Sequence, residues 1–158
     1  MLSRIAPVAA IALCPALASA GPKVDMSCQD DIGTPENCVP LIACIGGEGN
    51  YFTGRAMGWN EGTFAGDTQA GPSCSGAWTS QNSLGLGQAV FECDNGTSGV
   101  AFFTYQDSLT GTATGQGLMS DGSRLRVWSG RNIRQFIANK SGDVDAALTC
   151  GEVVVPIS

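Results

Sequence analysis

Four of the eight basic residues and one tryptophan lie close together in the sequence. Arg124, Arg126 and Trp128 alternate along one stretch, and Arg131 and Arg134 follow directly. Alternate residues of a β-strand lie on one face, so we expect the first three side chains to share a surface. Guanidinium groups bind anionic groups through charge-assisted hydrogen bonds, and an aromatic ring provides a stacking surface. The stretch therefore predicts a binding site for an anionic or glycan partner.

The residue types needed for most hydrolytic chemistry are missing or scattered. The sequence has no histidine, which is the usual general base of serine and cysteine hydrolases and the commonest metal ligand. A carboxylate-based glycosidase needs two acids about 5 to 9 Å apart across a cleft, and no such pair can be read from the sequence. We therefore expect a protein that is not an enzyme and that has no cofactor and no metal site. Carboxylates in or near the expected strands are Glu48, Glu61, Glu92 and Asp107.

The acidic balance of the chain limits its partners. The formal net charge is −6 at pH 7. Such a surface repels nucleic acid and anionic lipid over most of its area. We expect a protein partner or an anionic or glycan partner, and no nucleic acid.

The first twenty residues have the features of a signal peptide. Arg4 precedes an apolar run that ends in the small residues Ala18, Ser19 and Ala20. Lipid attachment at Cys14 is an alternative, although Leu13 occupies a position that requires a small residue. No later apolar run approaches the roughly 20 residues that span a bilayer. We expect a secreted or periplasmic protein with no integral membrane segment.

Six cysteines follow the expected signal peptide. An even number in an exported chain predicts three disulfides, and the spacing lacks the close pairs typical of metal and redox sites. We expect short loops closed among the first three cysteines and a bridge between Cys93 and Cys150. Residues 21–37 form a disulfide-pinned lead-in loop in this interpretation, and residues 38–158 form a single β domain. The six cysteines are Cys28, Cys38, Cys44, Cys74, Cys93 and Cys150.

Two dipeptides, Asn95-Gly96 and Asp121-Gly122, predict β-hairpins with two-residue turns. Counting outward from the first turn places five apolar residues on one face. Counting from the second places Trp128 over Gly115, where its ring would cover bare backbone. In this alternative to a binding site, the tryptophan has a structural role over the glycine and the arginines pair with carboxylates. The face of the first hairpin contains Ala89, Phe91, Cys93, Val100 and Phe102.

Small residues occupy alternate positions in three of the expected strands. Such faces let another part of the chain approach closely, let a small barrel bend sharply, or accept a ligand, and we expect the structural use. Together with the hairpins they predict an all-β fold, a small disulfide-bonded antiparallel sandwich or irregular barrel, with one short helix near residues 131–139. The residues are Gly54, Ala56, Gly58, Gly85, Gly87, Ala89, Gly111, Ala113, Gly115 and Gly117.

The segments "FECDNG", "SDGSRL" and "SG" at Ser129-Gly130, followed by Cys150, resemble the periplasmic C-type lysozyme inhibitor family. The resemblance is confined to residues 91–158, and Ile133 stands where that family has a tyrosine. It implies an inhibitor of a secreted hydrolase. Our leading hypothesis is a non-enzymatic binding or envelope-associated module, with the inhibitor and a carboxylate-based glycan hydrolase as alternatives.

Overall fold

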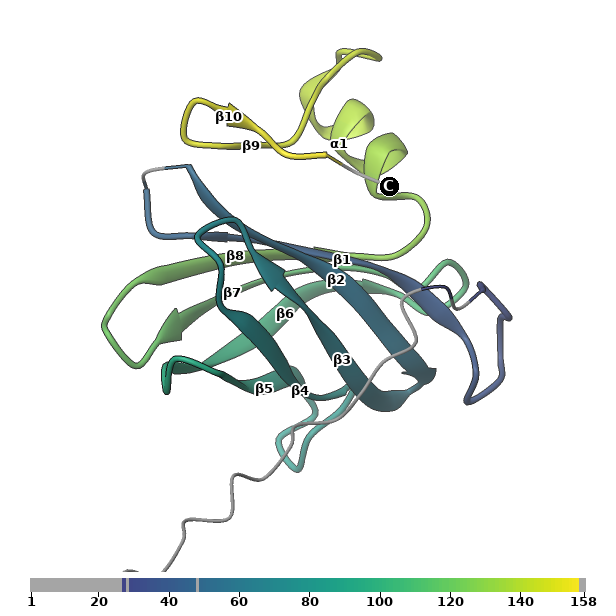
Figure 1. Cartoon of the computed structure of the whole chain (residues 1–158). Coiled ribbons are helices and arrows are strands. Elements are labelled where there is room, and N and C mark those ends of the chain that lie inside the picture. Colours follow the sequence, from purple (N-terminus) through teal and green to yellow (C-terminus); the bar gives the residue numbers. More distant parts are fainter. Residues whose placement is uncertain (1–26, 28, 48, 157–158) are drawn as a thin grey trace, which may run out of the picture.

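Eight antiparallel strands close into a barrel in the computed structural model of the chain, which describes residues 27, 29–47 and 49–156 (Figure 1). Each strand pairs with the next, and β1 pairs with β8 to complete the ring. The predicted all-β class is confirmed, and of its two architectures the barrel is the one formed. The predicted signal peptide and Cys28 lie outside the described residues. The strands are β1 Cys38–Ile45, β2 Asn50–Trp59, β3 Glu61–Thr68, β4 Ser73–Thr79, β5 Gly87–Cys93, β6 Ser98–Asp107, β7 Thr112–Met119 and β8 Arg124–Ser129.

The glycines of the strands face the inside of the barrel, where neighbouring backbone lies against them. A Cβ atom added to Gly62 would lie 1.9 Å from the carbonyl oxygen of Met57, and one added to Gly117 would lie 2.0 Å from that of Val100. The backbone of a neighbouring strand therefore occupies the space that a side chain would need. Glycines placed in this way let strands bend and coil tightly enough to close a small barrel.

The first predicted hairpin exists, but its register differs by one residue. Cys93 N–H donates to the Thr97 carbonyl, and Gly96 has a φ of 80°, so the loop contains three residues and not two. A three-residue loop ending in a left-handed glycine is the next most common hairpin connection. Ala89 therefore pairs with Ala101, and the inward face of β6 is that of Ala101. The predictions that Val100 and Phe102 share the core face are wrong, because Phe102 is exposed.

The second hairpin has the same three-residue loop. Met119 N–H donates to the Ser123 carbonyl, and Gly122 has a φ of 87°. Gly115 therefore pairs with Val127, and Trp128 pairs with Thr114. The prediction that Trp128 covers Gly115 is wrong, because the ring lies on the outer face of the barrel.

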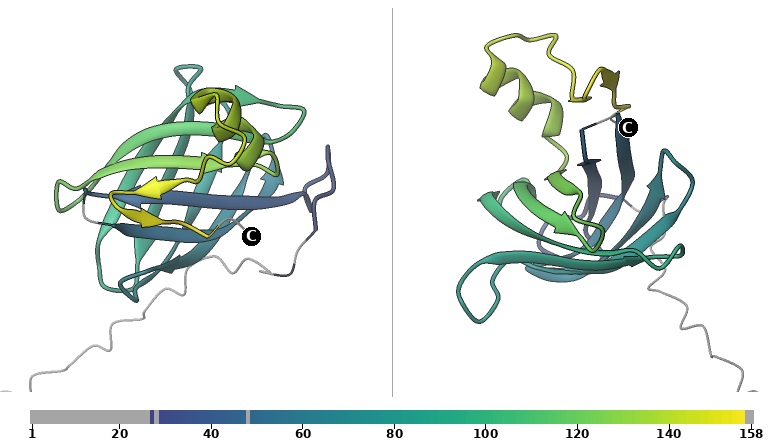
Figure 2. Two further views of the ribbon diagram at one scale, coloured as in Figure 1. Left: turned by 90° about the horizontal axis from the view of Figure 1, so that it is seen from above. Right: turned by 90° about the vertical axis from the view of Figure 1, so that its left-hand side faces the viewer.

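The chain after β8 forms a small cap on the outside of the barrel. It contains α1 (Ile133–Ser141), β9 (Thr149–Cys150) and β10 (Val153–Val154), and Figures 1 and 2 show it beside β1 and β8. The predicted short helix is confirmed, and it ends at Gly142, whose φ of 74° is left-handed. Cap and barrel share a second apolar core of Ile42, Cys44, Ile133, Leu148, Cys150 and Val155, against which Tyr51, Trp128 and Ile137 pack.

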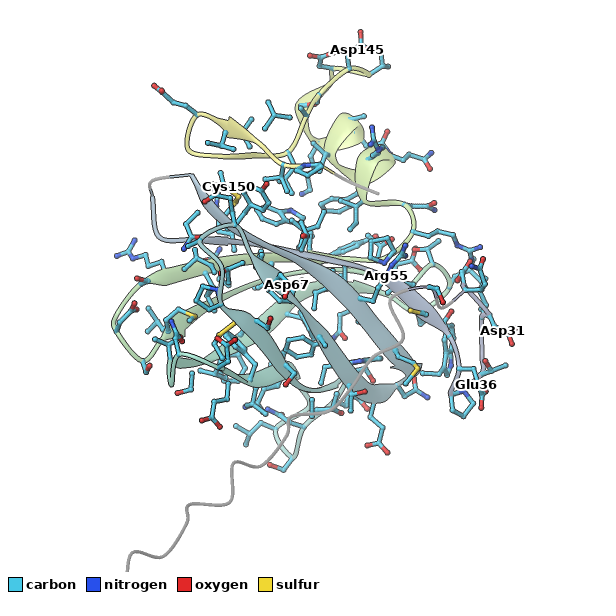
Figure 3. The ribbon with its side chains drawn as sticks, viewed as in Figure 1. Asp31, Glu36, Arg55, Asp67, Asp145 and Cys150 are labelled. Atoms are coloured by element: carbon cyan, nitrogen blue, oxygen red, sulfur yellow. A yellow bond between two sulfur atoms is a disulfide. The ribbon has the colours of Figure 1, made fainter. Side chains whose placement is uncertain are left out.

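Two disulfides join described residues. Cys44 on β1 bonds to Cys150 on β9, which is labelled in Figure 3, and Cys74 bonds to Cys93 on the neighbouring strands β4 and β5. Cys38 is also disulfide-bonded. The predicted bridge between Cys93 and Cys150 is wrong, because Cys93 belongs to the barrel core and Cys150 to the core beneath the cap.

Candidate functional site: a cavity inside the barrel

The barrel encloses a cavity of about 460 Å³. An eight-stranded barrel is wide enough either to be filled by its own side chains or to hold one small ligand. This barrel leaves space because alanine occupies inward positions in five strands. Its middle wall contains Leu41, Ala43, Ala56, Ala89, Ala101, Ala113, Leu125 and Val127.

Three phenylalanine rings narrow one end of the cavity. The Phe64 ring lies 6.4 Å from that of Phe52 and 6.1 Å from that of Phe91, measured between centroids, and both pairs meet edge to face. The Cys74–Cys93 disulfide joins the two strands at this end. Edge-to-face packing of aromatic rings is favourable beyond the apolar area that it buries. These residues form an apolar floor.

The loops at the opposite end form the mouth of the cavity. Lining residues there come from the turn between β2 and β3, the segments before β5 and before β7, the neighbouring strand ends, and the residue before β1. Most have polar side chains that carry no charge. The residues at the mouth are Asn37, Trp59, Asn60, Ser80, Gln81, Gln106, Asp107, Ser108, Thr112 and Ser129.

Hydrogen bonds to backbone hold several of these side chains in place. The buried Asn37 amide donates to the Gly58 carbonyl at 3.3 Å. The Gln106 amide donates to the Ser80 carbonyl at 3.2 Å and so links the ends of β6 and β4. The Trp78 indole N–H donates to the Met57 carbonyl at 3.3 Å, which fixes the ring in the wall. Asn37 and Gln106 are thus held in place at the mouth by the protein itself.

Asp107 is the one ionisable side chain among the described residues that line the cavity, because Cys74 is disulfide-bonded and does not titrate. The Thr110 hydroxyl donates to its carboxylate at 2.7 Å, and the Leu109 backbone N–H donates at 2.9 Å. These bonds hold the pKa of Asp107 below its ordinary value of 3.8, with the Thr110 hydroxyl as the main cause. Asp107 is therefore ionised at neutral pH, and it places a negative charge near the mouth.

The predicted arginine and tryptophan stretch lies outside the barrel, away from this cavity. Arg124, Arg126 and Trp128 do occupy one face of β8. Trp128 is half-buried against the cap core, and the Arg126 guanidinium lies 5.5 Å from the centre of its ring. Arg131 forms an ion pair with Asp30, and Arg134 belongs to α1. These contacts give Trp128 and Arg131 structural roles in the cap and the lead-in loop.

The structure does not gather the three described carboxylates of the candidate set into one site, and the fourth, Glu48, lies outside the described residues. Asp107 is at the mouth of the cavity, Glu61 is exposed at the start of β3, and Glu92 is exposed on β5. Within residues 29–47 and 49–156, no group of three or more histidine, cysteine or acidic residues could hold a metal ion. In the same part of the chain, no helix has the length and apolar character needed to cross a membrane.

The sequence analysis did not predict the cavity, although the sequence contains a pattern that accompanies it. Alternating glycine and alanine marked one bare face on several strands, and we expected another part of the chain to cover it. The glycines and the alanines on that face have different surroundings. Neighbouring backbone covers the glycines, as at Gly62, whereas alanines such as Ala101 border open space.

No family model matches the chain, and no curated protein matches it. Two solved structures are similar in fold. A redesigned beta barrel, mFAP0, bound to DFHBI has a TM-score of 0.48 at 14% identity, with 60% of this chain and 95% of that chain covered. A de novo designed fluorescence-activating beta barrel has a TM-score of 0.48 at 12% identity, with coverage of 68% and 99%.

Proposed function

We propose that this protein binds one small apolar molecule inside its barrel and catalyses no reaction. The observation that carries the proposal is the 460 Å³ cavity with an apolar wall and floor and a polar mouth. Ligand sites are typically apolar cavities of about 300–1,000 Å³ with a few well-placed polar groups. The cavity has room for on the order of 15 non-hydrogen atoms, taking each as about the 30 Å³ of a water molecule.

The proposal includes export to an oxidising compartment. Its support is the pair of disulfides, Cys44–Cys150 and Cys74–Cys93, which persist in secreted and periplasmic proteins and are rare in the cytosol. A binding protein in such a compartment would hold an apolar molecule that is poorly soluble in water. The identity of the natural ligand is not needed for the first test.

Titration with the neutral fluorophore N-phenyl-1-naphthylamine tests the proposal. We expect saturable binding of one molecule per chain, with the increase in emission that accompanies transfer to an apolar site. The double variant Ala89→Leu/Ala101→Leu extends two inward side chains into the cavity and should abolish the signal. Ala77→Leu makes the same substitution on an exposed residue of β4 and should leave it unchanged. Binding that survives the double variant would place the dye elsewhere and refute the proposal.

A further inference from the structure

We infer that the cavity selects uncharged ligands that carry a hydroxyl or N–H donor, and that it rejects carboxylates of the same size and shape. This inference rests on the proposed function and adds the chemical class of the ligand. It follows from three features of the lining: the sign of its charge, the state of its hydrogen-bond donors and the acceptor that remains.

A carboxylate would have no favourable orientation in this barrel. With its anionic group directed inward it would lie among alanine, leucine and phenylalanine side chains, and no lysine or arginine belongs to the described lining. An ionised group buried without a partner costs several kcal/mol. With the group directed outward it would lie near the mouth, where the charged residue of the described lining, Asp107, is negative. The net charge of −6 adds to that repulsion.

Several hydrogen-bond donors near the mouth are already used within the protein. Trp78 and Ser129 each donate their side-chain hydrogen to a backbone carbonyl, and the Asn37 and Gln106 amides each use one of their two N–H donors in the same way. Fewer donors therefore remain for an anionic group, which would need several.

An acceptor remains at the same place. The Gln106 amide donates through its nitrogen to Ser80, which leaves its carbonyl oxygen to accept. A hydroxyl or N–H at the outer end of a ligand would donate to this oxygen, whereas a purely apolar end would leave the oxygen to water.

Competition for bound N-phenyl-1-naphthylamine by three naphthalene compounds tests the inference. They share one ring system and differ in a single substituent: 2-naphthalenemethanol, 2-naphthoate and 2-methylnaphthalene. At pH 7 we expect the alcohol to compete at least tenfold more strongly than naphthoate, and more strongly than the methyl compound. Asp107→Asn should reduce the preference for alcohol over naphthoate about threefold, because it removes the charge. The asparagine oxygen can still accept from the Leu109 N–H, and the new NH2 group can donate to the Thr110 hydroxyl in place of accepting from it.

Glu92→Gln provides the matched control. Glu92 is an exposed carboxylate on β5 and is absent from the cavity lining, so this variant makes the same change in net charge at a distant place. We expect it to leave the preference unchanged. Naphthoate that competes as well as the alcohol, or a preference that Asp107→Asn does not alter, would overturn the inference. Failure of the fluorophore itself to bind would instead refute the proposed function.

Discussion

Ala101 gives the most direct test of whether the barrel interior is open. Its side chain is 1% exposed to solvent, and it lines the cavity between Ala89 on β5 and Gly117 on β7. Replacement by leucine adds three carbon atoms on an inward-facing position. The result depends on whether those atoms enter empty space or collide with packed neighbours.

The two cases predict opposite signs for the change in stability. Three buried carbons at about 0.8 kcal/mol each set an upper limit near 2.4 kcal/mol, and cavity-filling substitutions commonly gain about 0.5–2 kcal/mol. In a closely packed core the same atoms would cost about 1–3 kcal/mol through strain. Because the cavity is present, we expect Ala101→Leu to raise the free energy of unfolding by about 1 kcal/mol and to weaken binding of the fluorophore at least tenfold.

Urea denaturation under non-reducing conditions measures this change, provided that the dependence of stability on urea concentration stays constant. Ala77→Leu on the outer face of β4 is the control and should remain within about 0.5 kcal/mol of the parent. A loss of more than about 1 kcal/mol in Ala101→Leu, with a neutral control, would show a filled interior. That result would remove the basis for a ligand site.

Three further predictions concern the elements that hold the barrel. Gly62→Ala should lower the free energy of unfolding by at least about 3 kcal/mol or prevent folding, because the new Cβ would lie 1.9 Å from the Met57 carbonyl oxygen. A Cβ added at Gly47 would have nothing within 4 Å, so Gly47→Ala should leave the stability unchanged in the same denaturation assay. The Cys44–Cys150 disulfide links residues that are 106 positions apart in the sequence. Replacing both cysteines by serine should lower the free energy of unfolding by about 5 kcal/mol, measured by thermal or urea unfolding, and should leave the ligand affinity of the folded fraction unchanged. Because the pKa of Asp107 is lower in the folded protein than its ordinary value of 3.8, ionised Asp107 contributes to stability in full above pH 3.8. This contribution is lost as pH falls through the pKa of the folded state. Asp107→Asn should therefore show a smaller acid-induced loss of stability when unfolding is measured as a function of pH.

The sequence was sufficient for the fold class and insufficient for the register. Both hairpins form where Asn95-Gly96 and Asp121-Gly122 predicted them, yet each loop contains one residue more than a two-residue turn. A shift of one residue exchanges the two faces of a strand. For this reason Trp128 was assigned to the glycine face although its ring packs under the cap. The distinction depends on which backbone N–H closes the loop, and the dipeptide alone does not determine that.

Disulfide pairing and the cavity depend on contacts between distant parts of the chain. Six cysteines allow 15 pairings, and the pairing of Cys44 with Cys150 requires the cap to fold back over β1. The cavity requires β1 to meet β8 and complete the ring. Alternation showed which residues share a face of a strand. It could not show that this face encloses a volume, because that follows from closure of the whole sheet.

The two faces of β1 have different roles: one lines the cavity and the other packs against the cap. Leu41 and Ala43 face the cavity, whereas Ile42 and Cys44 face the cap, so the strand is buried on both sides and reads as a continuous apolar run. The cap lies over β1 and β8, the pair that closes the barrel, and its disulfide is anchored there. It therefore reinforces the seam from outside without contributing to the wall of the cavity. Inward alanines can then leave open space in a core that the outer apolar core and the cross-link help to stabilise.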